Sequence, residues 1–213
     1  MIIHQITTQH YSKYKMSDFE IYLPLGFQHI TDLQGYDHIL FVIALCAIYR
    51  LKDWKKVALL ITAFTIGHSI TLALATLNLI TYSTKLIELL IPITIVLTCL
   101  INFFHKSAEY SLDLQRPSFS RYPVAMTFGL IHGMGFSNYL KSLLGSEQSI
   151  WQPLLAFNIG LELGQLIIVV IVLIISSLLL DIFRVKKHNW NLILSGIVLG
   201  IALTLIRDAE FWK

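Results

Sequence analysis

Residues 153–183, PLLAFNIGLELGQLIIVVIVLIISSLLLDIF, decide the fold class of this protein. From Pro153 to Leu180 the only charged side chain is that of Glu162. An α-helix needs roughly 20 mostly apolar residues to cross the hydrocarbon core of a bilayer, and this run is longer than that. Backbone polar groups in lipid must be hydrogen-bonded within their own segment, so the run predicts a membrane-spanning helix rather than a strand.

The composition of the whole chain also indicates a membrane protein. Of its 213 residues, 55% are hydrophobic and 14% are charged, whereas soluble domains average ~25% charged residues. So little charge cannot cover a water-facing surface, which excludes a soluble enzyme domain. The small net charge of +3 and the lack of a separate basic block exclude nucleic acid as a partner. Cys46 and Cys99 lie in apolar runs without CxxC spacing, and we expect buried packing thiols.

Further apolar runs predict about six transmembrane helices. The predicted spans are residues 34–49, 56–80, 83–104, 122–144, 153–183 and 190–206. Because the first span is short, we expect residues 24–33 to form a turn or short helix that completes its depth. The predicted fold class is all-α, a polytopic membrane helix bundle in which residues 24–213 form a single transmembrane domain. We find no internal repeat along the chain.

The N-terminal segment and the loops set the expected orientation. Residues 1–23 are polar and lack the basic start and apolar run of a signal peptide, so we expect an extracytoplasmic segment there. Lys and Arg are concentrated in the loops at residues 50–56, 106–121 and 184–187. Cytoplasmic loops carry an excess of these residues, so both termini are expected on the extracytoplasmic side. The sequence leaves the oligomeric state open.

Several ionisable side chains lie within the predicted spans. A charged group at the bilayer centre costs ~2.5–3.5 kcal/mol even on insertion scales, so each such group needs a partner or a function. The ionisable residues of the spans are Asp37, His38, His68, His132 and Glu162, with the amides of Asn158 and Gln165 nearby. His29 lies just before the first span and is either a ligand or an interfacial residue. Glu88, near the end of its span, is expected to be an interfacial carboxylate.

These side chains are predicted to meet at one depth, between the midplane and the outer leaflet. His68 lies near the middle of its run, and a helix rise of ~1.5 Å per residue places His132 about 15 Å from the start of its span. Glu162 is about 13 Å from the start of its own span by the same rise. Asn158, Glu162 and Gln165 have the i, i+4, i+7 spacing of one helix face.

Imidazole and carboxylate groups without thiolates suit Ni(II), Co(II), Zn(II), Fe(II) or Mn(II). A transport site also requires moderate affinity, because the ion must leave as well as enter. The structural alternative is that these side chains only form hydrogen bonds between helices, as polar residues in membrane helices often do.

Four motifs, in the order found there, resemble the HupE/UreJ family. GFQH at residues 26–29 precedes GYDHILF at 35–41, and FTIGHS at 64–69, FGLIHGMGF at 128–136 and NIGLELGQ at 158–165 follow. The resemblance runs from about Pro24 to Arg207. Members of this family are bacterial inner-membrane proteins implicated in nickel uptake for hydrogenase or urease and regarded as secondary metal permeases.

The resemblance implies a multi-pass protein of the bacterial inner membrane. It also implies that His29 is the leading histidine of the family's first motif and that Asp37 and His38 form its Asp-His pair. This chain departs from the pattern in two ways. Ile30 stands where the family often has proline, and the spacing between His29 and Asp37 is longer.

Two functions from different classes fit the residues. The first is a permease for a divalent metal ion, with Ni(II) or Co(II) favoured by the resemblance. Its metal ligands would be His29, Asp37, His38, His68, His132 and Glu162, oriented by Asn158 and Gln165. The second is a membrane-embedded hydrolase in which the same set holds zinc and activates water against a lipid or lipid-linked substrate. A rhomboid-type serine protease is rejected, because no glycine follows Ser137 and the last span contains no histidine.

Overall fold

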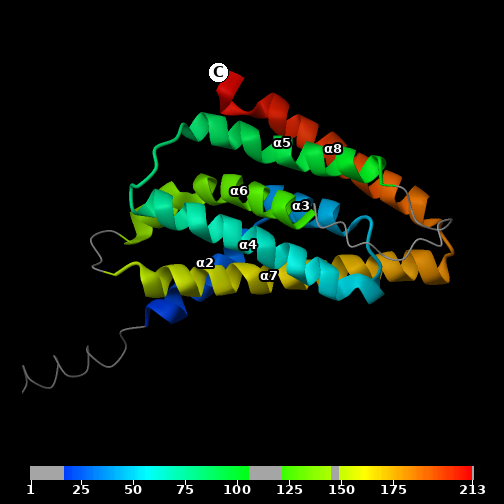
Figure 1. Cartoon of the computed structure of the whole chain (residues 1–213), viewed down its shortest axis with the longest axis horizontal. Coiled ribbons are helices and arrows are strands. Elements are labelled where there is room, and N and C mark those ends of the chain that lie inside the picture. Colours follow the sequence, from blue (N-terminus) through cyan, green and yellow to red (C-terminus); the bar gives the residue numbers. More distant parts are fainter. Residues whose placement is uncertain (1–16, 106–120, 145–148, 213) are drawn as a thin grey trace, which may run out of the picture.

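The computed structural model describes residues 17–105, 121–144 and 149–212. This part of the chain is all-helical, without strands, as the sequence predicts. Its α-helices are α2 (Asp18–Thr31), α3 (Asp37–Cys46), α4 (Trp54–Thr76), α5 (Thr84–Phe103), α6 (Arg121–Leu144), α7 (Trp151–Ser177) and α8 (Lys187–Asp208). A short π-helix, Leu178–Ile182, extends α7. Figure 1 shows the helices lying roughly along one common direction as a bundle.

Four segments of the described chain are long and apolar enough to cross a membrane. They are Leu51–Thr76, Thr84–Phe103, Trp151–Ile182 and Lys187–Trp212. The predicted count of about six is therefore not reached on length and composition alone. Helix α6 is long enough, but its glycines, His132 and Asn138 make it more polar than the other long helices. The sides on which the termini lie stay a prediction.

The first predicted span, residues 34–49, contains the short helix α3, and the short helix expected before it is α2, which begins earlier than residue 24. Helix α2 begins with a capping box, in which the Ser17 amide donates to the Glu20 carboxylate over 2.8 Å and the Glu20 amide donates to the Ser17 hydroxyl. It starts within the range 1–23 predicted to be a polar segment, of which residues 1–16 lie outside the described chain. The division at residue 24 stays a prediction.

The break between α2 and α3 has a local cause. The Asp32 carboxylate accepts a hydrogen bond from the Gln34 amide over 2.8 Å, which favours a turn over a further helical residue. Helix α3 then begins at Asp37, whose carboxylate accepts the His38 amide over 2.8 Å. That amide is one of the unpaired donors at a helix start, so Asp37 stabilises the new helix where His38 lies.

Glycines hold four helices together in two tightly packed pairs. Helices α2 and α7 touch where Gly26 faces the Phe157 carbonyl and Gly160 faces the Leu23 carbonyl. Helices α4 and α6 form the second pair. Here three glycines each face a backbone carbonyl of the other helix: Gly67 faces Met126, Gly129 faces Phe64 and Gly133 faces His68. A Cβ at these glycines would overlap the opposite backbone, so glycine permits the close approach. Each pair is parallel, because its contacts advance along both helices, from Leu23–Gly160 to Ile30–Gly164 in one pair and from Phe64–Gly129 to Thr71–Gly133 in the other.

The two pairs are related by an internal repeat. AFTIG at residues 63–67 of α4 matches AFNIG at 156–160 of α7, and GFQH at 26–29 of α2 matches GLIH at 129–132 of α6. The contacts match as well, because the glycine of GFQH faces the phenylalanine of AFNIG and the glycine of GLIH faces the phenylalanine of AFTIG. The prediction that the chain has no internal repeat is therefore wrong, as the tertiary contacts show.

This repeat is inverted. Helix α6 corresponds to α2 and helix α4 corresponds to α7. Figure 1 shows α4 and α7 running in opposite directions along the bundle, α4 from cyan at the right and α7 from yellow at the left. Corresponding helices of the two repeats therefore run in opposite directions. The third long helices, α5 and α8, pack against each other, and Cys46 and Cys99 are free thiols in the apolar core, as predicted.

Candidate metal centre

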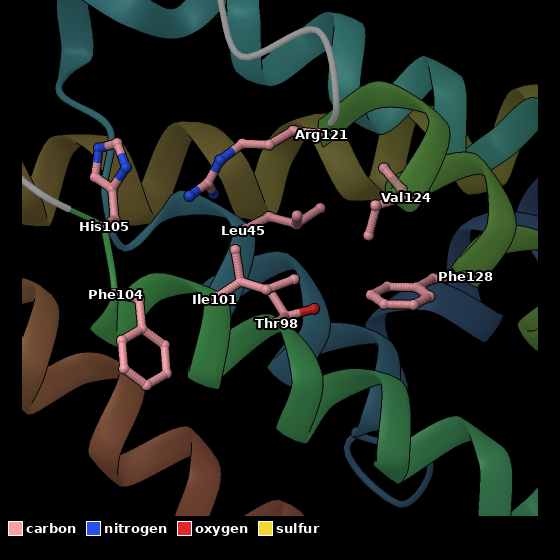
Figure 2. Close-up of a pocket in the computed structure, with 9 residues that line it drawn as sticks. Leu45, Thr98, Ile101, Phe104, His105, Arg121, Val124 and Phe128 are labelled. Carbon is pink, nitrogen blue, oxygen red and sulfur yellow. The ribbon is translucent and has the colours of Figure 1, made fainter.

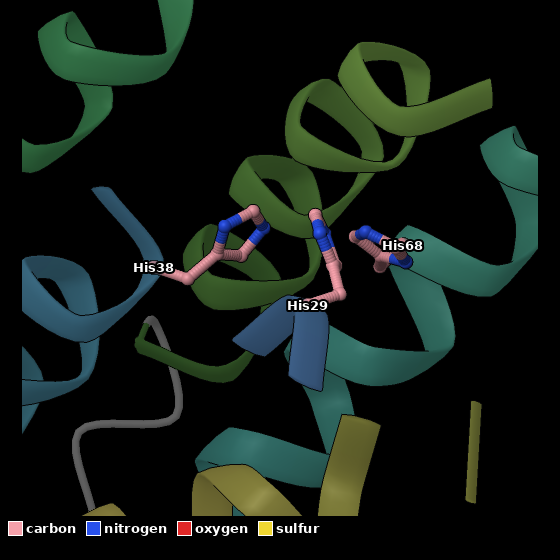
Figure 3. A group of neighbouring side chains, drawn as sticks. All are labelled: His29, His38 and His68. Carbon is pink, nitrogen blue, oxygen red and sulfur yellow. The ribbon is translucent and has the colours of Figure 1, made fainter. Parts of the chain in front are cut away.

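Histidines from α2, α3 and α4 form the first part of the centre. Figure 3 shows His29, His38 and His68 directed toward one another from these helices. One nitrogen from each ring lies within 4.8 Å of the others. The His29 ring centroid is 4.8 Å from that of His38 and 6.2 Å from that of His68. The break between α2 and α3 makes this possible, because it lets two consecutive helices carry His29 and His38 to the same place.

Asp37, His38 and His132 form the second part of the centre. Their ligating atoms also lie within 4.8 Å of one another. His38 Nδ1 is 3.0 Å from Asp37 Oδ1, and the ring centroids of His38 and His132 are 5.0 Å apart. His38 therefore belongs to both groups, which together bring three helices and the start of α3 to one location.

The ring nitrogens of these residues are buried and largely without partners. His38, His68 and His132 are at most 4% exposed. Within the described chain, neither ring nitrogen of His68 has a hydrogen-bond partner, and the same holds for His29 Nε2, His38 Nε2 and His132 Nδ1. Buried polar groups are normally hydrogen-bonded, so a cluster of unsatisfied imidazole nitrogens needs an explanation. A cation bound between them would satisfy these lone pairs.

A threonine that the sequence analysis did not single out completes the surroundings of His132. The Thr94 hydroxyl lies 3.0 Å from His132 Nε2, and its own carbonyl accepts from Thr98 one turn later. A hydrogen bond at one ring nitrogen selects which nitrogen is free to bind an ion. The spacing of Thr94 and Thr98 on a single face of α5 was the available signal.

Two cavities lie near the centre, and they differ in how they reach it. The larger, ≈ 930 Å³, is lined by His29 together with Gln28, Asp32, Gln34, Phe136 and Tyr139. It therefore opens directly onto a candidate ligand. The smaller, ≈ 270 Å³, is lined by Arg121, His105, Thr98 and Phe128, among others (Figure 2). None of the five clustered Asp and His side chains lines it.

The predicted residues of α7 lie elsewhere. Thr62 donates to the Glu162 carboxylate over 2.7 Å, and Thr65 donates to the Gln165 side-chain oxygen over 2.9 Å. The Asn158 amide donates to the Leu154 carbonyl. Among the described residues, the structure groups neither Glu162 nor any other α7 carboxylate with the histidines. Glu162 and Gln165 instead connect α7 to α4, and the ligand role of Glu162 stays a prediction.

The residues expected to be peripheral are also placed. Glu88 is exposed near the start of α5, and His188 is exposed near the start of α8. The interfacial position of Glu88 stays a prediction. The predicted basic loop at residues 106–121 lies outside the described residues except for Arg121.

A family model described as HupE / UreJ protein matches residues 5–207 of the chain. The chain belongs to the HupE/UreJ family. No curated protein and no solved structure matches it. The family match includes every residue of the two ligand groups. Together with the four apolar helices, it establishes this HupE/UreJ protein as a membrane protein.

Proposed function

We propose that this protein is a secondary permease of the bacterial inner membrane for a divalent transition-metal ion. The ion would be bound by the five side chains that gather in the two groups, His29, Asp37, His38, His68 and His132. Nitrogen and carboxylate donors without a thiolate match Ni(II) or Co(II), and the family resemblance favours these two ions. The ion is the substrate and passes through the site.

The observation that carries this proposal is the position of the ligands between inverted repeats. His29 belongs to the α2·α7 pair, and His68 and His132 belong to the α4·α6 pair. Secondary transporters are commonly built from inverted repeats, bind substrate at the repeat interface near the midplane, and use broken helices there. The α2–α3 break next to His29 and Asp37 supplies such a helix.

The two cavities favour a transport site rather than a site that is closed on all sides. Only the larger one reaches a ligand, so the ion would have access from one end of the bundle in this conformation. Transport requires access from the other end in a second conformation. We propose that Glu162 and Gln165 act in this cycle as positioning residues, because they hold α7 to α4 through Thr62 and Thr65.

Uptake of labelled Ni(II) and Co(II) by cells that produce the protein tests this function. His68 is fully buried with two free ring nitrogens, so His68→Ala is expected to reduce uptake to the level of cells without the protein. His188→Ala changes an exposed histidine of α8 and is the matched control, expected to transport like the parent. Wild-type uptake by His68→Ala at equal membrane abundance would overturn the proposal. Hydrolysis of a lipid-linked substrate without uptake would favour the enzyme instead.

A further inference from the structure

We propose that the centre holds a single ion at either of two overlapping positions that share His38. The outer position consists of His29, His38 and His68, and the inner position consists of Asp37, His38 and His132. This inference rests on the proposed function, since it describes how the same ion would move through the site.

The distances separate the five ligands into two positions. Metal–nitrogen bonds of about 2.0–2.1 Å allow ligating atoms of one ion to lie no more than about 4.2 Å apart. Each group of three lies within 4.8 Å, so small rotations of the rings suffice to close it around an ion. The five atoms do not form one such group. An ion therefore binds one set or the other.

His38 can take part in both positions without leaving its place. Its ring centroid is 4.8 Å from that of His29 and 5.0 Å from that of His132, on the two sides of the centre. Nδ1 faces Asp37, while Nε2 has no partner within the described chain. An ion that moves between the positions thus keeps a histidine that both sets share. Two divalent ions at this separation would repel strongly in a buried site, so single occupancy is expected.

The positions differ in charge and in access. The outer position consists of neutral imidazoles, and His29 lines the ≈ 930 Å³ cavity. The inner position adds the Asp37 carboxylate and lies beside Thr94. An ion that arrives from the cavity would first exchange water for the imidazoles and then gain the compensating Asp37 carboxylate. The Asp37 carboxylate lies 3.0 Å from Nδ1 of the shared His38, so a dehydrated ion has a counter-charge nearby in either position.

The positions also differ in the helices that form them. The outer one needs His29 of α2 and His68 of α4, so it joins both helix pairs. The inner one needs only the start of α3 and His132 of α6. A displacement of the α2·α7 pair relative to the α4·α6 pair would therefore separate His29 from His68 and open the outer position.

Binding of Co(II) to the purified full-length protein tests the two positions. The d–d absorption of Co(II) and its X-ray absorption count the imidazoles bound to the ion. His29→Ala should leave one Co(II) per chain with two imidazoles and a carboxylate. Asp37→Asn should leave one Co(II) with three imidazoles. His38→Ala should weaken binding by more than the ~10–100-fold that follows loss of an outer-shell partner, and His188→Ala should bind like the parent.

The possible results separate this inference from the proposed function. If His29→Ala and Asp37→Asn each lose the ion as completely as His38→Ala, the ligands form one position and the inference is wrong. Two Co(II) ions per parent chain would also overturn it. Should His38→Ala fail to fold, the pair His29→Ala and Asp37→Asn decides the question alone. A parent that binds Co(II) as expected but supports no uptake would overturn the permease and leave the two positions standing.

Discussion

The α2·α7 pair and the α4·α6 pair share one mode of packing but carry different chemistry. Both use glycines that face backbone carbonyls at corresponding positions. His29 of α2 and His132 of α6 also correspond. Yet His68 of α4 corresponds to Leu161 of α7, and both side chains are fully buried. Close packing is therefore the shared requirement of the fold, whereas the α4·α6 pair carries two candidate ligands and the α2·α7 pair carries one.

The pairs differ further in helix continuity. Helix α6 continues past His132 through Gly133 and Gly135 to Leu144, whereas α2 ends at Thr31, soon after His29. The turn that follows α2 lines the larger cavity. The α4·α6 pair thus supplies His68 and His132, and the α2·α7 pair supplies His29 at the access side. Asp37 and His38 come from α3, which belongs to neither pair. Three experiments test this comparison, beginning with the largest expected effect.

Replacing the repeat-related glycines should destabilise both pairs alike. A Cβ at Gly26 or Gly129 would overlap a backbone carbonyl of the partner helix, and overpacking costs typically ~1–3 kcal/mol. Gly26→Ala and Gly129→Ala should therefore both lower the unfolding temperature in detergent, followed by labelling of the buried Cys46 and Cys99. Gly196→Ala on α8 meets no atom within 4 Å and should be neutral or slightly stabilising. If Gly26→Ala lowered the unfolding temperature as little as the control does, the two pairs would not be equivalent in packing.

Removing the Thr94 hydroxyl next to His132 should weaken metal binding only at the inner position. Thr94→Val keeps the side-chain shape but loses the contact to His132 Nε2, and loss of such a partner costs ~10–100-fold in metal affinity. In Asp37→Asn protein, where only the outer position is expected to bind, Thr94→Val should have no further effect on Co(II) affinity. An equal loss in both backgrounds would show that Thr94 does not act through the inner position.

Cutting the connection between the pairs should have the smallest effect on stability. Thr65→Val removes the donor to Gln165, and Thr62→Val removes the donor to Glu162. Interhelical hydrogen bonds in membrane proteins average ~0.6 kcal/mol, so either variant should unfold close to the parent temperature. Uptake should change more than stability, since these residues position α7. Unchanged uptake in both variants would remove α7 from the proposed cycle, and Thr204→Val on exposed α8 is the matched control.

Some of the site follows from residue type and depth, and some does not. Rise along a helix placed His68, His132 and Glu162 in one slab, but it does not say which way a side chain points around the axis. The i, i+4, i+7 stripe on α7 was a correct reading of one face for Glu162 and Gln165, and that face meets the threonines of α4. His29, whose role was open in the sequence, joins the cluster because α2 extends from Asp18 and packs along α7.

The internal repeat shows a similar division. Its matching residues are few, GFQH against GLIH and AFTIG against AFNIG, although they follow one another in the same order in the two halves. In the first half a helical break separates α2 from α3, while α6 is continuous. Short matches of this kind become meaningful only when the same backbone contacts join them in space.

The sequence alone determined that this protein lies in a lipid bilayer and which residues are available for chemistry. A chain with 14% charged residues and apolar runs longer than a bilayer crossing has to hide its backbone polar groups in helices, whatever its tertiary structure. Which polar side chains meet was decided by helix packing, because rotation and crossing of helices depend on contacts between distant residues. Glycines at Gly26, Gly129 and Gly160 set those contacts, and so bring His29, His38, His68 and His132 to one place.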